Sequence, residues 1–382
     1  MVTTTSASMI RSERSPLHEA SSNNVSPLAK DALLRLRRWS DLAKSGGAES
    51  VDLRSKAFHG VSDDARPVVW RILLGVIDED PSTWISVLKE KRAQYHQWRR
   101  EFQGFHRARD VASAEPEDAE SNGKKNSAEH IDAREIFQRD VSLLKEIDKD
   151  VSRTQSELPF FAVGSMQQQW MMRILFVHAK LHPELGYMQG MNEILAPIIF
   201  VYGSDPSEEW AREAEADAFH SFQSIMSSAK ILYSRSPTDP TKTGVDMQMA
   251  RLAVLLRQHD ALLWQHLNSI GLTPEFYSFR WYMTLLAREF PMPITLRIWD
   301  TLLSDARRFS FLHYINCALV RSQRATLLQE GFTGALRVLQ ALPGADTIED
   351  VLASAVAMRD RDRATDQCRV VSPRATPDGF NA

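Results

Sequence analysis

The chain has 382 residues, of which 43% are hydrophobic and 25% are charged, a composition typical of a globular protein with a sizeable core. Its formal net charge of −3 gives no electrostatic reason to expect nucleic acid as a partner. Only Cys317 and Cys368 occur, which excludes a disulfide framework and a cysteine-based zinc site and indicates a reducing compartment.

No segment has the length or composition of a membrane anchor or a targeting peptide. The longest apolar stretch, around residues 194–202, is too short to span a bilayer. The N-terminus is rich in Ser and Thr and lacks the apolar core of a secretory signal. We therefore expect a cytoplasmic protein whose association with endomembranes is peripheral or made through a partner.

The first third of the chain alternates between unpatterned and helical segments. Residues 1–28 are expected to be disordered, and residues 29–52 to form a short helix and a linker, with the arginines of that helix in solvent. From Leu53 the chain is densely patterned, and helices are predicted at residues 70–76 and 84–102. Residues 104–131 lose the pattern and read as a flexible insertion inside a domain.

The remainder is predicted to be helical, and no convincing alternating strand is present. Helices are expected at residues 141–151 and 170–181, from about Gln189, and near 211–232, 245–268, 275–290, 294–304, 309–330 and 333–342. Residues 343–382 are expected to form a C-terminal helix that gives way to a disordered tail from about residue 359. The fold class is all-α, with one large multi-helical domain at residues 53–342.

An arginine stands at the predicted end of the 141–151 helix, in a motif of the form I-x-x-D-x-x-R made by Ile147, Asp150 and Arg153. Asp150 lies three residues before Arg153, within reach for an ion pair. Such a pair is either a local contact worth a few tenths of a kcal/mol, or a brace that holds the guanidinium so that it projects rigidly from the surface.

A glutamine stands at the next predicted helix start, in a motif of the form Y-x-Q-G-M. Tyr187 offers a hydroxyl that can fix the turn, and Gly190 leaves room for close backbone approach. The primary amide of Gln189 can accept a hydrogen bond from water and donate one to a phosphate. Asn192 and Glu193 follow, and their expected role is capping and surface solvation.

An arginine and a glutamine presented together supply what slow GTP hydrolysis lacks. The cation stabilises the transition-state charge, at about 10³–10⁵ in rate, and the amide orients the attacking water. The chain has no G-x-x-x-x-G-K-[ST] phosphate loop of its own, so the nucleotide is expected to arrive on a partner.

One pair of residues has the spacing of zinc ligands. His178 and His182 lie at i and i+4 on a predicted helix, but the glutamate of H-E-x-x-H and a third ligand are missing. We expect no metal site.

Taken with their order along the chain, these motifs resemble the TBC-domain GTPase-activating proteins that act on Rab GTPases. An earlier arginine four residues before a tryptophan matches Arg66 and Trp70, and Trp299 with Asp300 looks like the family's later W-D position. The resemblance covers residues 53–342, with the insertion at 104–131.

The resemblance implies that Arg153 is an arginine finger and Gln189 a glutamine finger, both supplied in trans to a GTP-bound Rab, in the regulation of vesicle trafficking. Asp150, Tyr187, Ile147 and Gly190 would be supporting or orienting residues, and Arg66, Trp70, Trp299 and Asp300 structural ones. No cofactor of its own is implied, because GTP and magnesium belong to the GTPase. The alternative from another class is a non-catalytic scaffold or effector that binds a small GTPase.

Overall fold

The structure is a computed structural model that describes residues 26–44, 52–102, 128–233, 243–305, 308–342 and 344–371. Its helices are α2 (Pro27–Lys44), α3 (Leu53–Ala57), α4 (Arg66–Leu73), α5 (Trp84–Glu101), α7 (Ala128–Val151), α8 (Met166–Leu181), α9 (Met191–Gly203), α10 (Glu208–Ala211), α11 (Ala214–Tyr233), α12 (Gly244–His259), α13 (Ala261–Ser269), α14 (Phe279–Met283), α15 (Met292–Ser304), α16 (Leu312–Ser322), α17 (Arg324–Leu327), α18 (Phe332–Gln340) and α19 (Ile348–Val371). Short 3-10 turns lie at Pro159–Phe161, Pro274–Phe276, Arg308–Ser310 and Ala345–Thr347. Within these ranges there is no strand, so the all-α prediction is confirmed.

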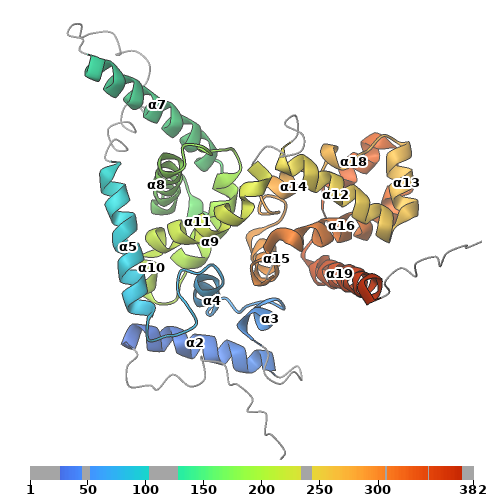
Figure 1. Ribbon diagram of the computed structural model, residues 1–382, viewed down its shortest axis with the longest axis horizontal. Coiled ribbons are helices and arrows are strands. Elements are labelled where there is room, and N and C mark those ends of the chain that lie inside the picture. The colour runs from blue at the N-terminus through green and yellow to red at the C-terminus, as the bar shows by residue number, and fades with distance from the viewer. Residues whose placement is uncertain are drawn as a thin grey trace, which may run out of the picture.

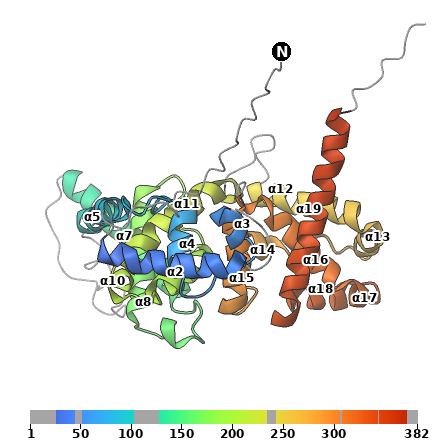
Figure 2. The same ribbon diagram turned by 90° about the horizontal axis from the view of Figure 1, so that it is seen from below.

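The helices form two lobes. Helices α2 to α11 gather on one side, α12, α13, α16, α18 and α19 lie on the other, and α14 and α15 lie between them (Figure 1). Helix α2 lies beside α3 and α4 on the N-terminal lobe (Figure 2), and the end of α19 projects beyond the C-terminal lobe.

Helix α9 is the centre of the N-terminal lobe. It contacts α4, α7, α8, α10, α11 and α15. A helix that is packed on every side must be apolar all round. The sequence of α9, MNEILAPIIFVYG, is apolar after the first turn, as this packing requires. Gly190, the residue that precedes this helix, is therefore anchored to the most buried element of the lobe.

A buried carboxylate on α15 joins this helix to the segment at residues 61–70, far away in the sequence. Asp300 of α15 accepts hydrogen bonds from the Val61 backbone N–H at 2.9 Å, Arg66 Nε at 3.1 Å and Trp70 Nε1 at 2.8 Å. The ring of Trp70 stacks on Trp299, 5.8 Å between centroids. The structure thus brings Arg66, Trp70, Trp299 and Asp300 into one buried cluster, although they are far apart in sequence.

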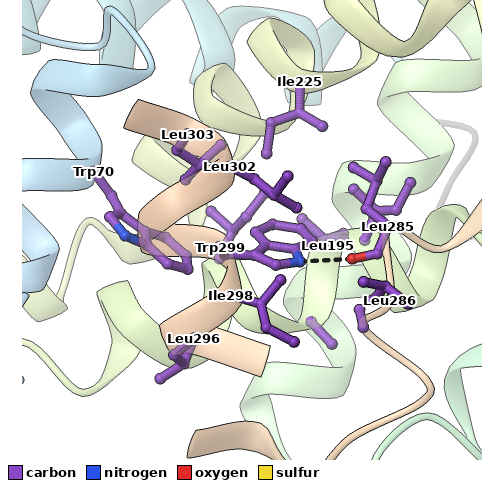
Figure 3. Packing of buried hydrophobic residues seen from close by; sticks show 14 of the residues in the cluster. Trp70, Leu195, Ile225, Leu285, Leu286, Leu296, Ile298, Trp299, Leu302 and Leu303 are labelled. Carbon is purple, nitrogen blue, oxygen red and sulfur yellow. Dashed lines mark hydrogen bonds between the residues drawn. The ribbon is translucent and has the colours of Figure 1, made fainter. Parts of the chain in front are cut away.

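Trp299 extends this cluster to the segment after α14. Its indole Nε1 donates to the carbonyl of Leu285 at 3.0 Å, beside Leu195 of α9 (Figure 3). Leu285 and Leu286 both have left-handed backbones, with φ of 50° and 64°, and both are buried. Leucine rarely adopts this conformation, so the surrounding packing holds the segment in it.

A second buried charge network ties α2 and α5 to the lobe. Arg71, which is fully buried, donates to Asp205 and Asp217 at 2.9 Å each. Arg35 of α2 bonds Asp205 at 3.0 Å, and Arg92 of α5 bonds Asp217 at 2.8 Å. Arg35 is therefore buried, and the expectation that it lies in solvent was wrong, because its partner comes from a distant part of the chain.

Several predicted helix boundaries were wrong. The 245–268 helix breaks at Asp260, whose side chain accepts from the Leu263 backbone N–H at 3.1 Å and starts α13. Residues 275–290 contain only a 3-10 turn and the short α14, since the chain turns left-handed after it. The 309–330 segment splits at Gln323 into α16 and α17.

At the chain ends and in the insertion the outcome is mixed. Helix α2 begins at Pro27 and α7 begins at Ala128, each inside a range expected to be unstructured, and α19 runs to Val371, past residue 359. The rest of the expected N-terminal disorder, most of the 104–131 insertion and residues 372–382 lie outside the described residues.

We predict that Asp300→Ala lowers the free energy of unfolding by about 3–5 kcal/mol, because it leaves the buried Arg66 guanidinium without its charge partner. Denaturant unfolding measures this change. The control is Asp63→Ala, which removes the other carboxylate beside Arg66 from a side chain that is 96% exposed, and which should cost less than about 1 kcal/mol. Equal effects of the two substitutions would contradict the assignment of Asp300 as the anchor.

Candidate functional site

Arg153 projects from the turn that ends α7. Ile147 and Val151 face the core of the lobe and are buried, which fixes the rotation of the helix. The Thr154 hydroxyl donates to the Asp150 carbonyl at 2.7 Å and so satisfies one of the carbonyls left open at the helix end. The side chain of Arg153 remains 48% exposed.

Gln189 lies in the turn between α8 and α9. Helix α8 ends at Leu181, before Pro183, and Gly186 turns the chain with a φ of 64°. Gly190 has a φ of 105° and directly precedes α9, so Gln189 lies outside the helix that we expected to start at this residue. Gln189 is exposed. Its amide makes no hydrogen bond within the described part of the chain, so it is free to contact a partner.

Gly190 serves the protein's own packing. A Cβ at this position would lie 3.6 Å from the Met283 carbonyl oxygen and 3.6 Å from Cγ2 of Thr284. The turn that carries Gln189 therefore packs against the end of α14 and the residue that follows it. By contrast, a Cβ at Gly186 would meet nothing within 4 Å.

The two motifs meet at one buried carboxylate. Asp150 pairs with Arg153 Nη2 through Oδ1, and its Oδ2 accepts the Tyr187 hydroxyl at 2.7 Å. Asp150 is only 4% exposed, so both contacts form out of bulk water. The end of α7 and the turn before α9 are thereby joined, which brings the Arg153 and Gln189 turns to one face.

Asn192 makes a second connection between the same two turns. Its Oδ1 accepts from the Gly190 backbone N–H at 3.1 Å and lies 3.3 Å from the Tyr187 hydroxyl, whose single hydrogen points to the nearer Asp150, and its Nδ2 donates to the Thr154 hydroxyl at 2.8 Å. Asn192 is 4% exposed, so the expected solvation was wrong, whereas its contact with the Gly190 N–H at the start of α9 is a capping interaction, as expected. A polar residue in the first turn of an otherwise apolar helix was the available signal.

Burial shifts the pKa of two groups at the site. Burial and the hydrogen bond to Asp150 raise the pKa of Tyr187, so its hydroxyl stays a donor at neutral pH. Glu193 is also buried, contrary to the expected solvation, and burial raises the pKa of its carboxyl. Its charge partner, Arg288, approaches to 3.9 Å.

The arrangement presents one guanidinium and one primary amide from a shared, rigid base. A guanidinium stabilises anionic oxygens, and an amide can hold a water molecule against an acceptor at the same time. Neither group needs a proton transfer of its own to do this. The face suits a phosphoryl group that is brought to it from outside.

The two histidines at the spacing of zinc ligands share a glutamine as their hydrogen-bond partner. His178 and His182 both contact Oε1 of Gln223, at 3.2 and 3.0 Å, and their ring centroids are 4.8 Å apart. No group of three or more potential metal ligands is found among the described residues. In the same part of the chain, no helix is both long and apolar enough to cross a membrane.

Comparisons with known proteins agree on one family. The family model described as the Rab-GTPase-TBC domain matches residues 63–328. The chain is 28% identical to human TBC1 domain family member 13 in an alignment 398 positions long that covers 85% of this chain and 98% of that protein. It is 28% identical to mouse TBC1 domain family member 5 in an alignment 369 positions long that covers 86% of this chain and 44% of the relative. The crystal structure of the Ypt/Rab-GAP domain of Gyp1p aligns with a TM-score of 0.65 at 23% identity, covering 86% of this chain and 98% of that one.

We predict that His178 makes the protein less stable in mild acid. Burial, with the nearby His182, lowers the pKa of His178 from 6.5 to about 4. Between these values the unfolded chain binds a proton that the folded chain does not, so the free energy of unfolding falls as pH falls from about 6.5 to about 4. The loss attributable to His178 is at most about 3 kcal/mol.

Urea unfolding at several pH values measures this dependence. His178→Gln should give a shallower slope in that window, whereas His59→Gln, at an exposed histidine, serves as the surface control. An unchanged slope in His178→Gln would contradict the prediction.

Proposed function

The chain belongs to the Rab-GTPase-TBC domain family, and from this premise we propose that it stimulates GTP hydrolysis by a Rab-family GTPase through Arg153 and Gln189. The observation that carries the proposal is the shared Asp150 carboxylate, which joins the arginine turn to the glutamine turn. Two separate surface residues would have no reason to be linked in this way.

In this mechanism the GTPase brings GTP and magnesium, and the chain brings two side chains. The Arg153 guanidinium moves against the transferring phosphoryl group and stabilises the charge that develops there. The Gln189 amide accepts a hydrogen bond from the attacking water and donates one to a phosphate oxygen, which orients the water in line.

The supporting residues reduce the cost of ordering the fingers. Asp150 holds Arg153 close to its working position, and Tyr187 and Asn192 fix the position of the glutamine turn relative to Asp150. Because these groups are positioned before the partner arrives, little conformational entropy is lost on binding.

The partner in this proposal is a Rab in its GTP-bound form, since the γ-phosphate is the group on which both fingers act. The chain works in the cytoplasm, reaches endomembranes peripherally or through the GTPase, and regulates vesicle trafficking by ending the GTP-bound state.

We predict that Arg153→Ala lowers stimulated hydrolysis by about 10³-fold or more while the protein stays folded, because the guanidinium stabilises the transition-state charge. The buried Asp150 loses its charge partner in this variant, so the melting temperature should also fall, and circular dichroism at the assay temperature checks that the protein is folded. Single-turnover phosphate release from a panel of purified, GTP-loaded Rabs measures the effect. Arg337→Ala, an exposed arginine on α18, is the matched control and should retain full activity.

Gln189→Ala should lower the same rate by about 10²-fold or more, with Gln265→Ala on α13 as its control. If both finger variants stimulated a responsive Rab as well as the unaltered protein, the dual-finger mechanism would be wrong. If the protein bound Rabs without accelerating phosphate release, it would be a binding module, not an activator.

A further inference from the structure

An exposed apolar surface follows directly after the Arg153 turn. Within eight residues, Pro159, Ala162, Val163 and Met166 are all exposed, and we call this set the apolar ridge. Val163 is 82% exposed and Met166 is 59% exposed. Single exposed apolar residues are ordinary, but four of them within a stretch of eight residues that contains no charged side chain are typical of an interaction surface.

One buried side chain ties the ridge to the helix that carries Arg153. Gln168, which is 6% exposed, donates from Nε2 to the carbonyls of Val151 at 3.3 Å and Phe161 at 3.1 Å. Its Oε1 accepts from the Gly164 backbone N–H at 3.0 Å. Val151 is the last residue of α7, so the ridge and Arg153 are fixed to the same helix end.

The base of the ridge is anchored a second time. Phe160 packs against Phe161 and Phe200, with ring centroids 5.0 and 5.1 Å apart. A Cβ at Gly203 would lie 2.8 Å from Phe160 Cζ, so the phenyl ring fills the space that only glycine leaves at the end of α9. The ridge is therefore a rigid surface, although it lies between two helices and has exposed apolar side chains.

We propose that the apolar ridge is a docking surface for the GTPase, and that it receives an uncharged, apolar patch next to the partner's nucleotide site. This inference rests on the proposed function. A standard protein interface buries about 800 Å² on each partner, so a GTPase whose phosphate reaches Arg153 also covers residues attached to the same helix end.

The chemistry of the ridge makes it a specificity surface. The contacts of Gln168 and Phe160 hold the backbone of the ridge, so little backbone entropy is lost when its apolar side chains are buried by a partner, and a charge opposite them would be desolvated without a partner. The ridge therefore favours GTPases with an apolar patch at this position and rejects those with a charged one.

Measuring kcat and KM for the responsive, GTP-loaded Rab distinguishes the effect of the ridge from that of the fingers. Val163→Asp and Met166→Asp should each raise KM by about tenfold with kcat nearly unchanged. The conservative variant Val163→Ile should keep the KM of the unaltered protein. Val254→Asp, at a valine on α12 that is 62% exposed, is the matched control and should change neither value. Arg153→Ala should show the opposite pattern, with kcat lowered.

The outcomes distinguish the two proposals. An unchanged KM in both ridge variants, with kcat still lowered in Arg153→Ala, would overturn the docking surface and leave the proposed function in place. Full activity of both Arg153→Ala and Gln189→Ala would overturn the dual-finger mechanism. If sedimentation showed a dimer that Val163→Asp dissociates without any change in KM, the ridge would be a contact between copies of this chain and the proposal would be wrong.

Discussion

The carboxylate of Asp150 is the interaction on which the candidate site depends. It is buried and receives a guanidinium on one oxygen and a phenol on the other. Burying a carboxylate costs free energy unless its charge is paired and its lone pairs accept hydrogen bonds. The buried Asp150 therefore requires both the Arg153 guanidinium and the Tyr187 hydroxyl. Through this requirement, two turns separated by the whole of α8 become a single surface.

The apolar periodicity of the sequence was enough to predict most helices and the fold class. Residues 84–102 were predicted to be helical and form α5. This prediction was possible because an amphipathic pattern indicates both the type of element and the face that it buries. The Asp150–Arg153 pairing was likewise visible, since it is local. Where the local pattern and the tertiary packing agree, helices and local ion pairs can be predicted from the sequence alone.

What stayed hidden depends on distant partners. Nothing near Arg35 indicates that Asp205 will bury it, and nothing near Asn192 indicates the hydroxyl of Thr154. Leu285 and Leu286 have no local preference for a left-handed backbone, and their conformation follows from the packing around Trp299. These residues would need to be placed in three dimensions before their roles could be assigned.

The left-handed segment after α14 belongs to both lobes. It follows α14, which contacts α12, and its Leu285 carbonyl accepts a hydrogen bond from the Trp299 indole. Met283 at the end of α14 and Thr284, directly before the left-handed residues, support Gly190 in the glutamine turn. The two lobes are therefore not interchangeable modules. A chimera that joins lobes from two relatives would have to keep this segment, together with α15, on the N-terminal side of the junction, or the graft would misplace a turn whose own residues were never altered.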